Sequence, residues 1–377
     1  MPEPHNRKTI FGWCMYDWAN SAYITTVVAG VLPAYFSQEV VGPIGVKIGG
    51  IPYSATTLWG FTIGLAAFLT FLFAPILGAV ADFSSTKKNF LLIFAYTGSL
   101  FTILLYFCQA GDIFRTIFFF LIAQISFICG NVFYDAFLPQ ITTKEKMNWV
   151  SGKGYSYGYA GGGLQFSLTL GFLAGHEQLG LSQDVMARLG LAFAGLWWAT
   201  FSIFPAKYLS ESSSEETLPP RFRHLPFWLG YLAIGFSRTV QTTRHIGRLR
   251  HLLIFLLAFM FYNDGIQTVI NMATIYGKDE LGLNMTDLML TLLIIQVVAT
   301  IGALVFSQLA SWLGTKRTIM LTLLIWSGVV IYAYFIQSAS EFFGLGMVVG
   351  LALGGSQALS RSLYGSMIPP EASAEFY

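Results

Sequence analysis

Long apolar runs separated by short polar connections dominate the pattern along the chain. Each run holds about 20 residues or more, which is the length that an α-helix needs to cross a bilayer. Strands of a membrane barrel would instead alternate apolar and polar positions over about ten residues. The runs lie at 10–36, 55–81, 89–109, 113–138, 155–175, 185–209, 251–276, 286–313, 318–338 and 342–368. The pattern predicts an all-α integral membrane fold with ten transmembrane helices.

A shorter apolar stretch at 225–236 lies in the long polar connection between the sixth and seventh runs. It is too short to span a bilayer, so it predicts an amphipathic helix that lies along the membrane interface. The connection divides the chain into three parts. These are a six-helix N-terminal half at 1–209, a cytoplasmic linker with the interfacial helix at 210–250, and a C-terminal half with helices seven to ten at 251–377.

Composition and charge agree with a lipid environment. Hydrophobic residues make up 55% of the chain and charged residues 11%, whereas soluble domains carry roughly 25% charged residues. Of the 21 Lys and Arg residues, 16 fall in connections on one side of the predicted helices and four on the other. Positive charge collects on the cytoplasmic side of membrane proteins. The N-terminus is therefore predicted to be cytoplasmic.

The two predicted halves repeat each other. Residues 78–88, after the second run, align with residues 307–317 after the eighth, and residues 134–139 align with residues 364–369. Two six-helix halves in parallel repeat are the build of major facilitator transporters. The repeat therefore predicts twelve helices, of which ten are present. We expect a C-terminally truncated sequence, and a native ten-helix protein is the alternative.

Three segments resemble one family within that superfamily. Residues 13–23, WCMYDWANSAY, resemble the YDWANSAY signature that opens the UMF1 and Atg22-like (vacuole effluxer-like) family. Residues 262–268, YNDGIQT, and 354–363, GGSQALSRSL, resemble its seventh and tenth helices. The resemblance implies a multi-pass transporter, and fungal members are associated with export of amino acids from the vacuole. We expect the plasma (inner) membrane for a prokaryotic source and the vacuolar membrane for a eukaryotic one.

Ionisable residues inside the apolar runs are the candidate chemistry of this chain. Asp17, Asp135, Asp264 and Arg361 fall on runs one, four, seven and ten, which are equivalent helices of the repeat. Charges are expensive in lipid and usually mark substrate pathways or proton relays. Each has polar neighbours at helical spacing. The predicted substrate- or proton-binding residues are Asp17, Asn20, Tyr23, Asn131, Asp135, Asn263, Asp264, Gln267, Gln357 and Arg361.

Two interpretations of these residues stay open. In the first, Asp17 and Asp264 face a central cavity and bind a cationic group or a proton, while Arg361 attracts a carboxylate. One pole of each sign suits an amino-acid zwitterion. In the second, the charges pair across helices and lock the bundle, or Asp135 and Arg361 are solvated near the cytoplasmic surface. Asp135 is the weakest candidate because Pro139 marks the helix end. The family tends to carry Asn where Asp135 stands.

A second set of charges lies on the turns that follow runs two and eight. Asp82, Lys87 and Lys88 occupy the first turn, and Lys316 and Arg317 occupy the second. A carboxylate and cations on a tight turn predict an ion-pair latch that breaks when the halves rock, with an ordinary cytoplasmic turn as the alternative. In the superfamily the equivalent Asp contacts the start of helix eleven. The partner of Asp82 is therefore left unassigned.

The fifth run is rich in glycine, at Gly154, Gly158, Gly161, Gly162, Gly163 and Gly171. Small residues allow helices to approach closely. We therefore expect this helix to pack at the interface between the halves, with simple flexibility as the alternative.

Together these features favour a secondary transporter that moves a small solute, with amino acids expected, by alternating access. No GxxxxGK[ST] loop is present to bind ATP, which favours an electrochemical or proton-coupled cycle. The alternatives are a transporter of another small solute, such as a sugar or peptide, and a membrane receptor or scaffold. An enzyme is disfavoured, since none of the five His residues has an Asp at motif spacing. We expect no cofactor, no metal site, no nucleic-acid partner and a monomer.

Overall fold

The computed structural model describes residues 6–211, 219, 222, 226–246 and 249–377. Helices account for almost all of this part, and a two-stranded antiparallel hairpin joins the first and second helical segments. The N-terminal half consists of α1 (Arg7–Ala22), η1 (Tyr23–Val31), α2 (Leu32–Tyr35), η2 (Phe36–Val40), β1 (Val46–Ile48), β2 (Ile51–Tyr53), α3 (Ala55–Ser84), α4 (Lys87–Leu104), η3 (Leu105–Phe107), α5 (Ile113–Ala136), α6 (Leu138–Ile141), η4 (Lys144–Lys146), α7 (Met147–Ala174), α8 (Gln183–Phe201) and α9 (Ile203–Tyr208).

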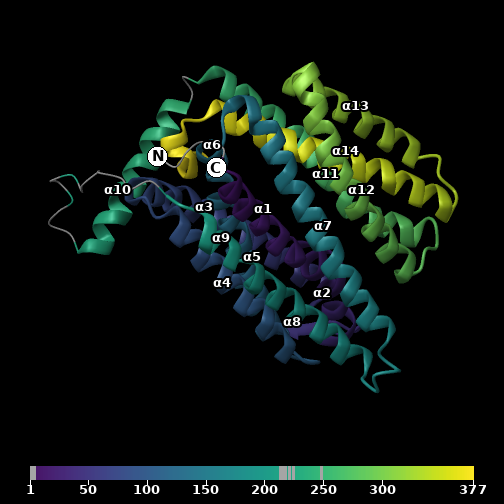
Figure 1. The fold of residues 1–377 in the computed structure, drawn as a ribbon. Helices are drawn as coiled ribbons and strands as arrows, with labels where there is room; N and C mark the ends of the chain where they lie inside the picture. Colours follow the sequence, from purple (N-terminus) through teal and green to yellow (C-terminus); the bar gives the residue numbers. More distant parts are fainter. Residues whose placement is uncertain (1–5, 212–218, 220–221, 223–225, 247–248) are drawn as a thin grey trace.

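The C-terminal half is smaller. It consists of α11 (Arg250–Asp279), α12 (Met285–Leu313), α13 (Thr315–Ala333), α14 (Ala339–Met367), η6 (Pro370–Ala372) and α15 (Ser373–Phe376). In Figure 1 the two halves come together at the end that holds α6 and the C-terminus, and they diverge toward the opposite end.

Each of the ten predicted runs coincides with a helical segment. In the described residues, eight helices are long and apolar enough to cross a membrane. The first and fifth runs fall outside this group. The first is divided because α1 changes into the π-helix η1 at Tyr23, and α7 is long but carries many Gly, Tyr and Ser residues that lower its mean hydropathy. The count of ten spans therefore stays a prediction.

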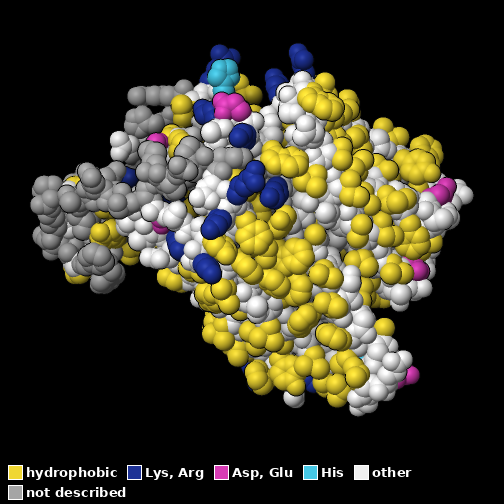
Figure 2. Space-filling view, viewed as in Figure 1, with side chains coloured by type: hydrophobic (Ala, Val, Ile, Leu, Met, Phe, Trp, Pro, Cys, Tyr) yellow, Lys and Arg dark blue, Asp and Glu magenta, His cyan; other side chains and the backbone are white. Residues whose placement is uncertain are grey.

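The surface has the character expected of a membrane protein. Figure 2 shows a broad apolar face, with Lys and Arg side chains gathered toward the end of the molecule where the chain termini lie. Exposed aromatic and aliphatic side chains include Phe61, Phe71, Leu324 and Ile331. Such a large exposed apolar area is unfavourable in water and favourable in lipid.

α7 lies between the two halves, where close approach depends on its glycines. A Cβ atom on Gly158 or Gly161 would collide with α1, at Asp17 and Trp18 respectively. A Cβ atom on Gly152 would collide with Ser307 of α12. The small residues thus let α7 touch α1 on one face and the C-terminal half on another. This confirms the predicted packing of the glycine-rich helix at the interface between the halves.

The linker contains a helix at the predicted place, and that helix is longer than expected. α10 (Phe227–Ile246) lies against α3, where Gly235 fits over Ile76 and Val80. The Thr239 hydroxyl donates to the carbonyl oxygen of Pro75 over 3.2 Å. The remaining linker residues at 212–218, 220–221, 223–225 and 247–248 lie outside the described residues.

Candidate functional site

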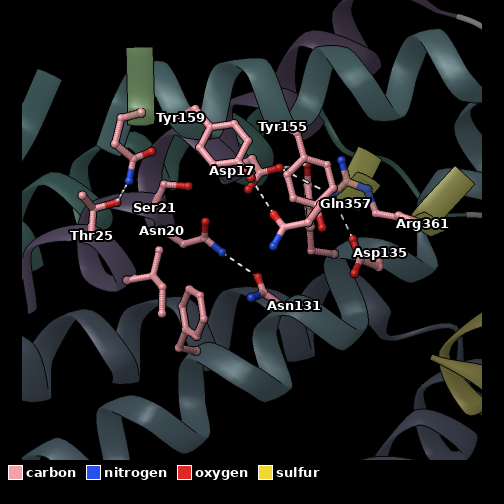
Figure 3. A pocket seen from close by; sticks show the side chains of 15 residues that line it. Asp17, Asn20, Ser21, Thr25, Asn131, Asp135, Tyr155, Tyr159, Gln357 and Arg361 are labelled. Atoms are coloured by element: carbon pink, nitrogen blue, oxygen red, sulfur yellow. Dashed lines mark hydrogen bonds and ion pairs between the residues drawn. The ribbon is translucent and has the colours of Figure 1, made fainter. Parts of the chain in front are cut away.

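A polar cavity of about 220 Å³ lies between the two halves. α1, α5 and α7 line it from the N-terminal half, and α12 and α14 line it from the C-terminal half. Figure 3 shows the acidic, amide and hydroxyl side chains that converge on it. Six of the predicted site residues contribute to the lining: Asp17, Asn20, Asn131, Asp135, Gln357 and Arg361.

Arg361 of α14 is the centre of the charged end of this cavity. Its Nη1 atom lies 3.1 Å from Asp135 Oδ1 on α5 and 3.4 Å from Asp17 Oδ2 on α1. Its Nη2 atom donates to the Ser151 carbonyl oxygen on α7 over 2.8 Å, and its Nε atom donates to Ser151 Oγ over 3.0 Å. One guanidinium therefore ties α14 to three helices of the other half.

Aromatic rings enclose the same guanidinium. Its Cζ atom lies 4.0 Å from the ring centroid of Tyr155, 4.7 Å from that of Trp13 and 5.3 Å from that of Tyr134. A cation over an aromatic face gains most when it is desolvated, and only 5% of the Arg361 side chain is exposed. Three of the four predicted charges, Asp17, Asp135 and Arg361, thus pair across helices, which is part of the second interpretation, while Asp17 also lines a cavity, which is part of the first.

Neutral amide and hydroxyl groups form the rest of the lining. Asn20 donates to Asn131 Oδ1 over 2.6 Å, which joins α1 to α5. The Tyr159 hydroxyl donates to Gln357 Oε1 over 2.6 Å, which joins α7 to α14. Gln296 of α12 donates to Thr25 Oγ1, while its own Oε1 atom is buried and accepts no hydrogen bond from the described residues.

A second cavity of about 350 Å³ adjoins the first. It lies against α11 and α14, and aromatic side chains such as Phe259, Tyr262 and Tyr364 supply much of its lining. Four residues line both cavities and form the wall that they share: Asp135, Tyr155, Gln357 and Arg361.

The latch predicted on the turn between α3 and α4 forms only in part. Lys87 Nζ lies 2.5 Å from Asp82 Oδ1, and both side chains are almost fully buried. The other oxygen of Asp82 accepts the backbone N–H of Glu375 on α15 over 2.7 Å, and Lys87 Nζ donates to Ser373 Oγ. The partner that the sequence left unassigned for Asp82 is therefore the start of α15.

A carboxylate absent from the predicted latch completes this cluster. Glu211, after α9, accepts the backbone N–H groups of Lys87 and Lys88 at the start of α4, with one oxygen each. A carboxylate at a helix N-terminus satisfies otherwise unpaired N–H groups. Burial raises the pKa of Glu211 and that of Glu375 above their ordinary values, because a desolvated carboxylate is less stable in its charged form.

Lys88, Lys316 and Arg317 do not join the latch. The side chains of Lys316 and Arg317 are exposed, and no ion pair links any of the three to another residue that the structure describes. The reason is that the turn before α13 lacks a carboxylate. Thr315, the residue aligned with Thr86, instead accepts a hydrogen bond from Asn148 of α7 over 2.9 Å.

Comparison with known proteins assigns the chain to a family. A family model described as "Vacuole effluxer Atg22 like" matches residues 5–377. The chain belongs to this family. The Atg22-like chain is 33% identical to the Uncharacterized MFS-type transporter YxiO of Bacillus subtilis, over 97% of its own length and 82% of that protein. It is 24% identical to Autophagy-related protein 22 of Kluyveromyces lactis, over 98% of its own length and 83% of that protein.

Solved structures show the same fold. The human organic anion transporter MFSD10 superposes with a TM-score of 0.68 at 16% identity, over 99% of this chain and 89% of that one. The proton:xylose symporter XylE superposes with a TM-score of 0.61 at 15% identity, over 98% of this chain and 84% of that one. The Atg22-like chain thus has the major facilitator fold, and it is a multi-pass MFS-type membrane transporter.

Four predicted site residues of the Atg22-like chain do not line the first cavity. Asp264 is exposed on α11 and lines neither cavity, and Gln267 lines neither. Their neighbour Asn263 lines the second cavity, because successive residues of a helix point about 100° apart. Tyr23 is buried in the core of the N-terminal half, where its hydroxyl donates to Gln124.

Several residues of the site were missed at the level of sequence. Ser151, Tyr155 and Tyr159 lie on α7, whose glycines drew attention to packing alone. Tyr155 and Tyr159 are four residues apart and so share a helix face, which was an available signal. Gln296 was another signal, because it is a lone amide in a strongly apolar stretch of α12. In the described residues no group of three or more His, Cys, Asp or Glu side chains could hold a metal ion.

Proposed function

We propose that this Atg22-like transporter moves amino acids across the membrane by alternating access, with a proton as the coupling ion. The observation that carries the proposal is the cavity between the halves, which combines Arg361 with Asp17 and Asp135 and with a lining of amide groups. A zwitterion needs groups of both signs. In rocking-bundle transporters the solute site lies at the interface between the two repeats.

The proposal includes ten membrane spans in this chain, with the N-terminus in the cytoplasm. Support comes from the clustering of Lys and Arg at one end of the molecule (Figure 2) and from the general bias of basic residues to the cytoplasmic side. A protease site fused before Arg7 is expected to be cut in inside-out vesicles and to be protected in right-side-out vesicles. The reverse result would invert the proposed orientation.

The substrate is tested by uptake into proteoliposomes that contain the purified protein. Labelled amino acids are expected to accumulate when the lumen is made alkaline, whereas labelled sugars and dipeptides are not. The variant Arg361→Gln is expected to abolish the uptake. The matched control is Asp264→Asn, which also removes one charge from a helix of the membrane domain but lies outside both cavities.

Flux of sugars or peptides without flux of amino acids would replace the proposed substrate class. The absence of flux for all three classes, in protein that is monodisperse and folded, would favour a receptor or scaffold on the same fold. Flux of amino acids that ignores the imposed pH gradient would remove the proton as coupling ion.

A further inference from the structure

The charged cluster of the first cavity is not electrically balanced. It holds two carboxylates, Asp17 and Asp135, against the single guanidinium of Arg361. The exposed fractions of the side chains are 13% for Asp17, 24% for Asp135 and 5% for Arg361. A buried charge without a counter-charge is strongly unfavourable in a medium of low dielectric constant. The cluster therefore favours the uptake of one further cationic charge.

The two carboxylates differ in how firmly they are held. Asp17 Oδ2 accepts the Tyr134 hydroxyl over 3.0 Å as well as Arg361 Nη1. The Asp135 side chain accepts one hydrogen bond from the described residues, from Arg361 to its Oδ1 atom. It is also the more exposed of the two. Asp135 can therefore release Arg361 at the lower cost, since Arg361 would keep Asp17 and Ser151 as partners.

The position of Asp135 between the cavities also distinguishes it from Asp17. It lines both cavities, whereas Asp17 lines only the first. Figure 3 shows Asp135 on the helix opposite Arg361, joined to it by a dashed line. The ion pair between them spans the wall that separates the cavities. Breaking this contact would loosen the wall and untie α5 from α14.

We infer that Asp135 is the exchangeable acid of the transport site, which accepts one cationic charge in place of Arg361 while Asp17 remains the fixed counter-ion of Arg361. The cationic charge is a proton or the primary ammonium group of a substrate. A proton from the cavity adds to a free carboxylate oxygen, and only the contact with Arg361 is lost. This inference rests on the proposed transport function and names the group that couples it.

The other titratable groups around Asp135 do not compete in the acidic range. They are Tyr134 on the same helix, Tyr16 on α1, Tyr155 on α7 and Tyr377 after α15. Tyrosine hydroxyls are neutral up to about pH 10. An acid response of the wall is therefore expected to come from Asp135 or Asp17, and substitution separates the two.

The test measures whether binding of a cation opens the wall between the two cavities. Ser21 lines only the first cavity, so Ser21→Cys serves as the reporter, and the three native cysteines are buried. A membrane-impermeant maleimide is added to inside-out vesicles that contain the Ser21→Cys protein. Each labelling rate is divided by that of glutathione at the same pH, because maleimide reacts with the thiolate and the thiolate fraction falls about 100-fold over two pH units. Acidification from about pH 7.5 to about pH 5.5, a range over which buried carboxyl groups can titrate, is expected to raise this normalised rate several-fold.

Variants in the same background assign the response. Asp135→Asn is expected to label rapidly at both pH values, and Asp135→Glu is expected to keep the pH response. Asp17→Asn is expected to weaken the response or move it to lower pH, because Asp135 is then the single counter-charge of Arg361. Methylammonium chloride at neutral pH, with potassium chloride as its control, tests the ammonium source. Acceleration by methylammonium identifies an ammonium ligand, and acceleration by acid alone identifies a proton.

The inference is overturned if Asp135→Asn still responds to acid, if Asp17→Asn labels rapidly at both pH values, or if neither acid nor methylammonium accelerates labelling in the reporter protein. Labelling does not depend on the identity of the transported solute. A response to acid without any flux of amino acids would therefore remove the proposed substrate and leave the exchange at Asp135. Amino-acid flux without the response would remove the exchange at Asp135 and leave the proposed substrate.

Discussion

Arg361 carries most of the geometry of the site because its side chain is planar and has five N–H donors. It uses them on Asp17, Asp135 and Ser151 and presents its faces to aromatic rings. An ammonium group carries the same charge but has neither the flat face nor the forked donors. A positive charge alone therefore cannot replace the hydrogen bonds and ring contacts of Arg361.

We predict that Arg361→Lys lowers amino-acid uptake by at least about tenfold, which corresponds to the loss of about 1.4 kcal/mol of interaction. Uptake into proteoliposomes measures it. The same exchange at exposed Arg317, Arg317→Lys, is the matched control and is expected to leave uptake unchanged. Equal uptake by both variants would mean that the several N–H donors and the stacked geometry of Arg361 have no part in transport.

Single residues could be predicted from the sequence where they broke a pattern. Asp17, Asp135 and Arg361 were identified because a charge inside an apolar run is costly and therefore conspicuous. Tyr155 was missed because aromatic residues are common in membrane helices and this one adds no charge. Asp135 had been ranked lowest because it is close to Pro139, yet it contacts Arg361 and lines both cavities.

At the scale of elements, α7 shows how small residues determine helix contacts. Its glycines face α1, α12 and α14 at distances that leave no room for a side chain, whereas Gly171 near its end has open space around the position of a Cβ atom. The same residue type therefore has two different roles along one helix. A periodic pattern of glycines does not reveal which of them are crowded.

We predict that Gly161→Ala destabilises the protein by about 1–3 kcal/mol, the typical cost of overpacking a close contact. A Cβ atom there would lie 2.5 Å from the carbonyl oxygen of Trp18 on α1. Gly171→Ala is the control, and it is expected to be neutral or slightly stabilising because alanine favours the helix. Thermal unfolding in detergent compares the two. A similar melting temperature for both variants would contradict the close packing of α7 on α1.

The first helical segment contains a change of helix type that the apolar pattern does not reveal. The apolar run from 10 to 36 predicted a single span, and the structure contains α1 followed by the π-helix η1. π-helical turns are uncommon and often occur at functional sites. Thr25 in η1 bonds Gln296 across the interface between the halves, and Thr26 bonds Gln165 of α7. These polar partners lie on other helices, so the local sequence could not indicate them.

At the scale of the whole molecule, contacts between the halves concentrate at the end that holds α6 and α15. Asn148 joins α7 to Thr315 and to Ser362, and the Lys87–Asp82 pair contacts α15. Each of these contacts must break if the halves rock apart at this end. The latch therefore contributes to the balance between the two access states.

We predict that Lys87→Gln shifts this balance toward opening at the α6 end. Labelling of Ser21→Cys from that side should increase several-fold, and exchange transport should slow, because Asp82 loses its buried partner. Lys88→Gln is the matched control, since Lys88 follows directly in the sequence but forms no ion pair with a described residue. Increased labelling in both variants would attribute the effect to the charge of the turn rather than to the latch.

The sequence by itself predicted the helical segments and the family, and it marked Asp17, Asp135 and Arg361 as candidates for the site. The helical runs and the conspicuous charges follow from local properties, because the apolarity of a run and the cost of a charge in lipid depend on residues that are close together in the chain. The family followed from short motifs. Only the tertiary structure decided which face of each helix meets the cavity and which charges pair. Asp264 turns away while Asn263 turns toward a cavity, and Arg361 serves both Asp17 and Asp135. Rotation about a helix axis is set by packing against neighbours that are distant in the chain.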